Sequence, residues 1–460
     1  MTKRIFGETD GVRGKANYFP LDVNTVVNFG RAIAEFTKKT VEPNPNRDYK
    51  VIIGKDTRRS GYMVEQALTA GFLSRGVDVM TIGPVPTPAL SHLVKSFALD
   101  LGVEITASHN PYTDNGIKVF DRFGGKISDK EELAIEEMFT ENHFLDIDKI
   151  GRAKRIEDVT GRYIEFVKSI SGHLSLKGMT IVVDCANGAA YKTAPTVFEE
   201  LGAKVIKIGI DPNGYNINLN CGALFPEEVK KAVLENKADL GIALDGDADR
   251  VIMVDELGHI IDGDYIMALI ATSMKEKGQL KKNTLVTTQY SNLAMIEYLN
   301  KNDIKVDNSI ANGDHAIISL CKKEGYNLGG EQTGHYILFD YIDTGDGTLS
   351  SLIVMKYMKQ KGMKLSDLAY KFEKYPQKQV AIEVLQKTPL EKIEGLDKLI
   401  NSWESKFGHE GRVFLRYSGT ENKLRIMVES KKKALLENAM AEISEFLRLY
   451  FKSKNILKNG

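Results

Sequence analysis

The chain has 460 residues, of which 42% are hydrophobic and 27% charged, a composition typical of a soluble protein with ordinary hydrophobic cores. This length predicts about three domains, and roughly two to four are reasonable. The 62 basic residues balance 62 acidic ones, which argues against nucleic acid or an anionic membrane as the main partner. A site for an anionic ligand must therefore be a local concentration of Lys, Arg and backbone N–H groups.

Three cysteines, Cys185, Cys221 and Cys321, lie far apart in the sequence. An odd number at this spacing fits neither a disulfide framework nor a CxxC metal site, so we expect reduced, buried thiols. Residues 1–11 become polar too early for a signal peptide, and no uninterrupted apolar stretch is long enough to span a bilayer. These features predict a soluble, cytoplasmic protein.

Three segments repeat the order strand, polar or small-residue loop, helix, strand. They are residues 49–83, 179–209 and 283–309. This order predicts mostly parallel sheets with helices on their faces. The spacing, on the order of a hundred residues, predicts three related α/β domains rather than a short-period repeat.

After about residue 370 the pattern changes. Residues 378–385, 411–419 and 423–430 are typical of strands, and residues 432–451 of an amphipathic helix. This predicts a C-terminal α+β module. The predicted domains are 1–152, 153–256, 257–373 and 374–460, and because no long linker separates them we expect them to share a cleft.

The first polar loop, "TASHNP", follows a predicted strand and contains Ser108. Loops after strands are the expected place for a site in α/β proteins. A nucleophilic serine needs a base, but the adjacent His109 is not expected to face Ser108, and the GxSxG motif of α/β hydrolases is absent. A turn or helix-capping role for Ser108 stays open.

The second loop, "DGDADR", places Asp245, Asp247 and Asp249 at alternate positions. In an extended segment they point to one side and converge on one hard cation. Glu256 lies where an EF-hand has its last ligand, but Arg250 replaces the glycine of that motif and "VIMV" is typical of a strand. Solvated carboxylates without a metal are the other alternative. The pattern favours Mg²⁺ beside a phosphate.

The third loop, "GGEQTGH", offers Glu331, Thr333 and His335 as hydrogen-bonding groups for a polyol, although a plain tight turn is an equal alternative. The fourth, "RYSGTENKLR", offers two guanidinium groups, two hydroxyls and backbone N–H groups, which suit a phosphate. Its candidate residues are Arg416, Ser418, Gly419, Thr420 and Arg425. A turn between two strands is the alternative for this segment.

Together the four loops, in this order along nearly the whole chain, resemble the phosphoserine, metal, sugar and phosphate loops of the α-D-phosphohexomutase superfamily. The resemblance implies three related α/β domains and a C-terminal helix-grip-like domain around one cleft. It also implies a small phosphosugar substrate, Mg²⁺ as cofactor, a hexosamine or hexose 1,6-bisphosphate as activator, and a monomer or homodimer.

The resemblance also implies roles for single residues. Ser108 would be the phosphorylated catalytic serine, and its phosphate would share Mg²⁺ with Asp245, Asp247 and Asp249. His109 and Lys118 would lie beside the phosphoryl group, with Lys118 transferring a proton, and Arg13 and Arg250 would add positive charge. The sugar would meet Glu331, Thr333, His335 and His315, and the non-reacting phosphate would meet Arg416, Ser418, Gly419, Thr420 and Arg425.

Within the superfamily, "FGETDGVRG" and "GGEQTGH" are most similar to the bacterial phosphoglucosamine mutases. These interconvert glucosamine 6-phosphate and glucosamine 1-phosphate, on the route to UDP-N-acetylglucosamine, through a phosphoserine enzyme and a 1,6-bisphosphate. Departures from that subfamily occur at Glu8, Ala248, Thr333, Tyr417 and Asn422. His315 stands where an Arg is usual, and bacterial phosphomannomutase/phosphoglucomutases carry a His in that loop.

Two other hypotheses follow. His315 favours phosphomannomutase/phosphoglucomutase activity on mannose or glucose phosphates. A non-catalytic paralogue that binds sugar phosphates belongs to a different class, and the presence of Ser108 and all three aspartates argues against it.

Overall fold

The computed structural model describes residues 5–6, 11–141, 144, 147–311, 313–418 and 422–458. The chain forms two compact units, one of Met1–Thr288 with Asp307–Tyr370 and one of Gln289–Val306 with Lys371–Gly460. Among the described residues, no helix combines the length and the apolar character needed to cross a membrane.

The first sheet has six strands in the order β1-β5-β4-β2-β3-β6. The strands are β1 (Val12–Lys15), β2 (Lys50–Lys55), β3 (Asp78–Pro84), β4 (Leu101–Ile105), β5 (Asp114–Asp121) and β6 (Ala153–Arg155). The helices are α1 (Val23–Thr40), α2 (Gly61–Leu73), α3 (Thr87–Ser96) and α4 (Asp129–Glu141). Strands β2, β3 and β4 run parallel, and β5 runs antiparallel to β4.

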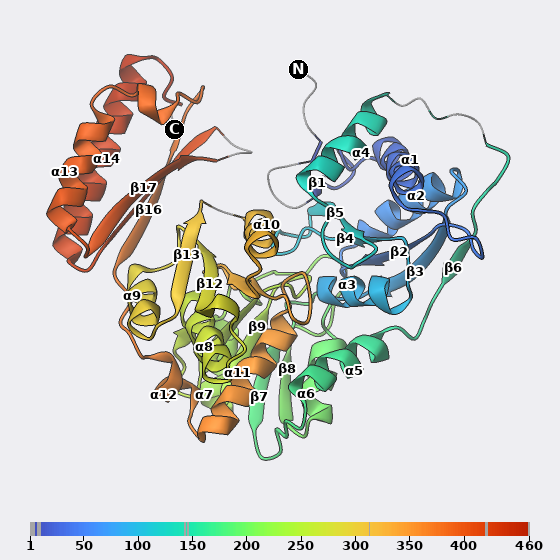
Figure 1. The fold of residues 1–460 in the computed structure, drawn as a ribbon, viewed down its shortest axis with the longest axis horizontal. Helices are drawn as coiled ribbons and strands as arrows, with labels where there is room; N and C mark the ends of the chain where they lie inside the picture. Colours follow the sequence, from blue (N-terminus) through green and yellow to red (C-terminus); the bar gives the residue numbers. More distant parts are fainter. Residues whose placement is uncertain are drawn as a thin grey trace. The chain divides into compact units, whose positions relative to one another are not determined.

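Alternation along the strands separates two faces of this sheet. Ile53 and Val103 belong to the core that the strands share with α1, α2 and α4. The neighbouring residues Gly54 and Gly102 face the other side of the sheet. They lie against Val85, which precedes α3, and against Leu90 and Val94 in α3. Figure 1 shows α1, α2 and α4 on one side of this sheet and α3 on the other.

The second sheet has the order β11-β10-β9-β7-β8. Its strands are β7 (Thr180–Asp184), β8 (Lys204–Ile208), β9 (Leu240–Leu244), β10 (Val251–Asp255) and β11 (Ile260–Ile261), and its helices are α5 (Thr160–Ser171), α6 (Thr193–Glu200) and α7 (Glu227–Asn236). Strand β7 is parallel to β8 and β9, whereas β9 and β10 form an antiparallel pair. Residues 245–250 are the turn of that pair.

The third sheet has the order β13-β12-β14-β15. Its strands are β12 (Thr284–Thr288), β13 (Lys305–Ile310), β14 (Leu328–Gly330) and β15 (Tyr336–Leu338). The accompanying helices are α8 (Gly263–Glu276), the short η1 (Lys281–Asn283), α10 (Asp314–Glu324), α11 (Gly347–Lys361) and α12 (Leu365–Ala369). The segment "GGEQTGH" joins β14 to β15.

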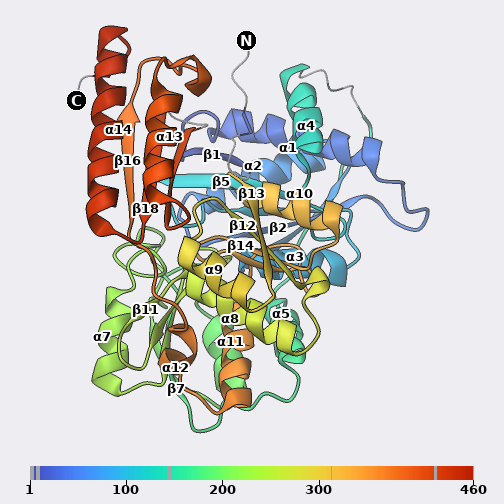
Figure 2. The same ribbon diagram turned by 60° about the vertical axis from the view of Figure 1, so that its left-hand side comes forward.

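The second unit is an antiparallel sheet of order β16-β18-β17 covered by helices. Its elements are α9 (Leu293–Lys301), β16 (Gln377–Glu383), η2 (Leu390–Lys392), α13 (Leu396–Phe407), β17 (Gly411–Tyr417), β18 (Lys423–Ser430) and α14 (Lys433–Ser453). Figure 2 shows α13 and α14 beside this sheet. Asn292 ties α9 to this unit through two 3.0 Å hydrogen bonds with the backbone of Tyr375.

The predicted fold class is confirmed: three α/β regions with mixed, mostly parallel sheets precede an α+β module. The predicted strand–helix–strand segments form β2-α2-β3, β7-α6-β8 and β12-α9-β13. The antiparallel strands β5 and β10 matter most for the site, because the Ser108 loop precedes one and the aspartate turn precedes the other.

Helices α1 and α2 cross where two glycines meet. A Cβ atom on Gly71 would lie 2.4 Å from the backbone oxygen of Val27 and 3.0 Å from the Cα of Gly30. We expect Gly71→Val to lower the free energy of unfolding by about 1–3 kcal/mol or more, because backbone atoms cannot yield to the new side chain. Thermal and urea unfolding measure this change.

Gly161 in α5 is the matched control, since an added Cβ there meets only one side-chain oxygen, of Asp158, at 3.9 Å. Gly161→Ala is expected to leave stability unchanged or slightly raised. Equal stability of Gly71→Val and the wild type would refute the close packing of α1 on α2.

Candidate active site

Ser108 lies on the loop between β4 and β5 and is only 1% exposed. Its φ of +51° is in the left-handed region, which is uncommon for a residue with a side chain. This backbone turn aims the side chain at the second sheet, where Ser108 Oγ donates a hydrogen bond of 2.6 Å to Asp245 Oδ2. Loops from two domains therefore meet at one hydroxyl group.

The same turn brings Ser108 Oγ to within 3.4 Å of His109 Nδ1. The sequence-based expectation that the two side chains do not face each other was wrong, because the left-handed backbone conformation bends the chain between them. Burial, followed by the nearby Arg250 and Arg13, lowers the pKa of His109 to about 3. The ring is therefore neutral near pH 7.

The Ser108 loop is held by groups that the sequence analysis did not identify. Arg58 Nη2 and Asn218 Nδ2 donate to the carbonyl oxygen of Ser108, at 3.2 and 2.9 Å. Arg58 is fully buried and forms an ion pair with Asp56. Gly246 completes the support, because a Cβ there would lie 2.5 Å from the same carbonyl oxygen.

Asp245, Asp247 and Asp249 are brought together as predicted, with carboxylate oxygens within 4.8 Å of one another. The geometric reason is different from the predicted one. The segment is a turn rather than an extended strand, with Ala248 at φ +57° and its N–H donating to the Asp245 carbonyl oxygen at 3.1 Å. The turn, and not two-residue alternation, gathers the carboxylates.

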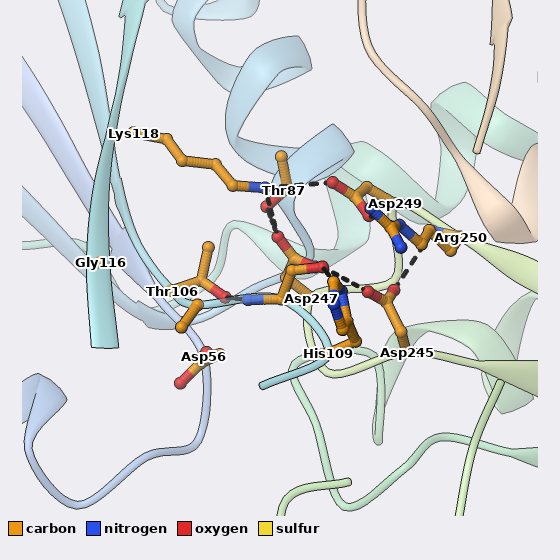
Figure 3. Close-up of polar contacts among 12 residues, drawn as sticks. Asp56, Thr87, Thr106, His109, Gly116, Lys118, Asp245, Asp247, Asp249 and Arg250 are labelled. Atoms are coloured by element: carbon orange, nitrogen blue, oxygen red, sulfur yellow. Dashed lines mark hydrogen bonds and ion pairs between the residues drawn. The ribbon is translucent and has the colours of Figure 1, made fainter. Parts of the chain in front are cut away.

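Besides Ser108, two more residues of the first domain contact these aspartates (Figure 3). Lys118, from β5, places Nζ 2.8 Å from Asp247 Oδ2 and 3.0 Å from Asp249 Oδ2. Thr87, the first residue of α3, donates its hydroxyl proton to Asp247 Oδ2 at 2.7 Å. Both side chains are buried, so the contacts are shielded from water.

The carboxylates fit a divalent cation. Asp247 Oδ1 and Asp249 Oδ1 are buried and, within the described part of the chain, accept no hydrogen bond. Buried oxygens without a donor are costly unless an ion or water satisfies them. A set of carboxylate oxygens beside a hydroxyl is the hard-ligand environment that Mg²⁺ prefers.

The charges in this cluster conflict. Burial raises the pKa of Asp245 well above its usual value, and Asp249 and Asp247 add to the effect. Burial also opposes ionisation of Asp249, but Lys118 and His335 outweigh it and hold the pKa of that carboxyl well below its usual value. Three ionised carboxylates this close need more positive charge than Lys118 alone provides.

His335 was predicted to meet the sugar, and the structure places its ring inside the cluster, 2% exposed. Its Nδ1 lies 3.7 Å from Asp249 Oδ1 and its Nε2 lies 3.5 Å from Asp314 Oδ2. Asp314 forms an ion pair with Lys126 of the first domain. His335 thus lies between the aspartate turn, residues 245–250, and the start of α10.

The remaining predicted site residues of the first unit differ in exposure and in their contacts. Glu331 is 9% exposed, and its Oε1 accepts from the N–H of Gly313 at 3.3 Å. Thr333 is exposed. His315 Nδ1 lies 3.8 Å from Asp129 Oδ1. Arg13 Nη1 donates to the carbonyl oxygen of Ala107 at 3.3 Å, one residue before Ser108.

The predicted phosphate loop belongs to the second unit. Arg416 and Arg425 are opposite each other on β17 and β18, and Arg416 Nε donates to the hydroxyl of Tyr290 at 3.1 Å. Ser418 is buried, and its N–H donates to the carbonyl oxygen of Lys423 at 2.8 Å. Gly419 and Thr420, and the departure at Glu8, lie outside the described residues.

A buried serine facing a cluster of carboxylates that fits a metal ion, on three α/β domains followed by an α+β domain, defines a phosphohexomutase, an enzyme of the isomerase class. The chain matches the phosphoglucomutase/phosphomannomutase α/β/α domains I, II and III over residues 3–146, 161–258 and 262–375, and the C-terminal domain of that family over residues 377–446. The chain belongs to this family.

Similar proteins span nearly its full length. Phosphoglucosamine mutase of Bdellovibrio bacteriovorus is 47% identical and covers 96% of this chain and 98% of its own, and that of Myxococcus xanthus is 48% identical and covers 97% of each. Among solved structures, a phosphoglucomutase/phosphomannomutase family protein of Burkholderia thailandensis has a TM-score of 0.79 at 21% identity, covering 98% of both chains.

A second solved structure is the N-acetylphosphoglucosamine mutase of Aspergillus fumigatus in complex with GlcNAc-6P and magnesium. It has a TM-score of 0.61 at 20% identity and covers 79% of this chain and 92% of its own. At this identity the likeness concerns the fold.

We expect Thr87→Val to lower kcat by about 10- to 100-fold, because Asp247 loses the hydroxyl that orients it while the side-chain volume is kept. Steady-state kinetics at saturating Mg²⁺ measure this change. Thr69→Val is the control, since that hydroxyl bonds only the backbone oxygen of Glu65 in α2. If both variants match the wild type, Thr87 has no part in the site.

Proposed function

We propose that the protein interconverts glucosamine 6-phosphate and glucosamine 1-phosphate, with Ser108 as the phosphorylated residue and a 1,6-bisphosphate as intermediate. The observation that supports the chemistry most directly is the position of Ser108 Oγ, 2.6 Å from Asp245 and beside the aspartate cluster. The choice of glucosamine rests on curated phosphoglucosamine mutases 47–49% identical over nearly the whole chain.

In the first half of the reaction, the free hydroxyl oxygen of the sugar bonds to phosphorus as the bond from phosphorus to Ser108 Oγ breaks. In the second, Ser108 Oγ bonds to the phosphorus of the other phosphoryl group as the bond from that phosphorus to its sugar oxygen breaks, which leaves a free hydroxyl on the sugar. We assign the proton transfers of these steps to Lys118, which lies among the aspartates. Arg58 and Asn218 hold the serine loop in place during both transfers.

Asp245, Asp247 and Asp249 would hold Mg²⁺ together with the phosphate on Ser108. When bound, the ion neutralises charge on the transferring phosphoryl group. Arg250 adds positive charge at the turn, because its side-chain Nε lies 3.9 Å from Asp249 Oδ1. Its backbone N–H also donates to Asp245 Oδ1 at 3.2 Å. Arg13 approaches the serine loop from β1.

We assign the grip on the non-reacting phosphate to Arg416, Ser418, Gly419, Thr420 and Arg425. Like charges directly opposite on neighbouring strands repel each other, and Arg416 and Arg425 are such a pair. An anion between or beside them removes the repulsion. Glu331, Thr333, His335 and His315 are assigned to the sugar side, with His335 also contacting the metal turn.

A soluble, cytoplasmic enzyme acting as a monomer or homodimer, with domains 1–152, 153–256, 257–373 and 374–460, is part of the same proposal. A hexosamine or hexose 1,6-bisphosphate would act as its activator.

The phosphoserine can be detected directly. We expect intact-mass spectrometry to find one added phosphate on the wild type after incubation with a bisphosphate, and none on Ser108→Ala, whose activity falls by about 10³-fold or more. Ser128→Ala, an exposed serine of the same domain, should keep both the phosphate and the activity. A phosphate that persists in Ser108→Ala would contradict the assignment.

Sugar preference separates the two candidate activities. We expect kcat/KM for glucosamine phosphate to exceed that for glucose and mannose phosphates by about tenfold or more, measured with Mg²⁺ and the matching bisphosphates. A preference for glucose or mannose would instead favour the phosphomannomutase/phosphoglucomutase alternative that His315 suggests. In that case His315→Arg is the first variant to test for recovery of glucosamine activity.

A further inference from the structure

Glu104, in β4, is a buried carboxyl group that the mechanism above does not use. It is 0% exposed, and neither Oε1 nor Oε2 has a hydrogen-bond partner in the part of the chain that the structure describes. Leaving both oxygens of a buried carboxyl group unsatisfied is costly, so a purely structural role is better served by an apolar side chain. The Glu104 carboxyl therefore needs a group to pair with in another state of the site.

The sheet places Glu104 beside Lys118. In the antiparallel pair of β4 and β5 the two residues are directly opposite, and on the other side Glu104 is level with Gly54 of β2. Directly opposite residues share one face of a sheet, with Cβ atoms about 5 Å apart. This is the face toward α3, whose first residue, Thr87, contacts Asp247.

The Glu104 carboxyl group now lies over Gly54. A Cβ on Gly54 would be 2.4 Å from Glu104 Oε2, and Val85 Cγ2 and Leu90 Cδ1 line the same space. The absence of a side chain at position 54 makes room for the carboxyl group on the side away from β5. Glu104 is thus held in an apolar corner next to Lys118 rather than paired with it.

The positive charge of Lys118 is balanced by two aspartates that a metal ion would also bind. Its ammonium group contacts Asp247 Oδ2 and Asp249 Oδ2. The Oδ1 atoms of the same two carboxylates, which accept no hydrogen bond within the described residues, are the ones that fit a cation. A divalent cation there repels Lys118 and withdraws negative charge from its two partners. An ammonium group that is buried and insufficiently compensated is strongly unfavourable.

We propose that Glu104 is a positioning residue that supplies the second counter-charge of Lys118 when a divalent cation occupies the aspartate cluster. The carboxyl group turns from Gly54 toward Lys118, ionises, and balances the ammonium group that the aspartates no longer balance alone. Glu104 thereby makes the binding of the cation more favourable without touching it. This inference rests on the metal site of the proposed function.

The surroundings of Glu104 favour its uncharged form when no cation is bound. Burial raises the pKa of Glu104 well above its usual value, the negative charges of Asp247 and Asp56 raise it further, and Lys118 acts in the opposite direction. A cation bound to Asp247 weakens the repulsion between the charges of Asp247 and Glu104. It also leaves more of the positive charge of Lys118 available to stabilise an ionised Glu104. Both changes favour the ionised form of Glu104.

The test is a double-mutant cycle on Mg²⁺ affinity, measured by isothermal titration calorimetry on proteins of the same Ser108 phosphorylation state. Glu104→Gln keeps the shape of the side chain but cannot become negative, and we expect it to weaken Mg²⁺ binding by about tenfold. In the Lys118→Met background there is no ammonium group to balance, so Glu104→Gln should have no further effect. Glu104→Met serves as the second variant, with the same expected direction.

Glu132→Gln is the matched control, because Glu132 is another buried glutamate of the first domain and lies in α4, on the side of the sheet opposite α3. It should change thermal stability but not Mg²⁺ affinity. Equal Mg²⁺ affinity of the wild type, Glu104→Gln and Glu104→Met overturns the inference. A loss that persists in the Lys118→Met background also overturns it, because Glu104 then acts on the cation directly. No Mg²⁺ binding by the wild type refutes the metal site itself.

Discussion

The site depends on the burial of three carboxylates within 4.8 Å of one another. Such a cluster repels itself and is poorly solvated, so the fold must bring compensating groups to it. The structure supplies Lys118 from β5, a hydroxyl from Thr87, and a backbone N–H from Arg250. The remaining unsatisfied oxygens are the ones that a divalent cation would complete.

The compensating groups come from different parts of the chain, and this explains the architecture of the first unit. The aspartate turn joins β9 to β10. The serine loop precedes β5, and Lys118 lies within β5. His335 reaches the same turn from the segment between β14 and β15 and continues through Asp314 to Lys126. One charge cluster therefore fastens three α/β domains together, and closely packed glycines such as Gly345, whose Cβ would lie 2.3 Å from the Asp249 carbonyl oxygen, allow the loops to approach.

Much of this could be predicted from the sequence, because the reactive residues stand in short glycine-containing loops after strands. Ser108, the three aspartates and Arg250 are distinctive as residue types and as motifs, and the structure brings them together. Thr87 and Asn218 could not be found in this way. Thr87 lies 160 residues from Asp247 at an ordinary helix start, and Asn218 lies 110 residues from Ser108, so both contacts exist only because of how the domains pack.

Local backbone conformation was the other limit. Alternating aspartates suggested a strand, and adjacent Ser and His suggested side chains that point apart. Ser108 and Ala248 both adopt positive φ values, which for residues with side chains depend on the surrounding structure rather than on local preference. The sequence thus identified the chemical groups more reliably than the turns that orient them.

Glu104 is another residue whose place could not be predicted from the sequence. Within "VEITASHNP" it is an ordinary strand position. Only the register with Gly54 and Lys118 shows that a carboxyl group without a hydrogen bond from any described residue lies near the aspartate cluster. A buried acid at this place has a cost in stability that an apolar residue would avoid. When Lys118 is protonated, its buried ammonium group needs a counter-charge with or without a bound cation. A second carboxyl group within its reach allows one ammonium group to serve both states of the site.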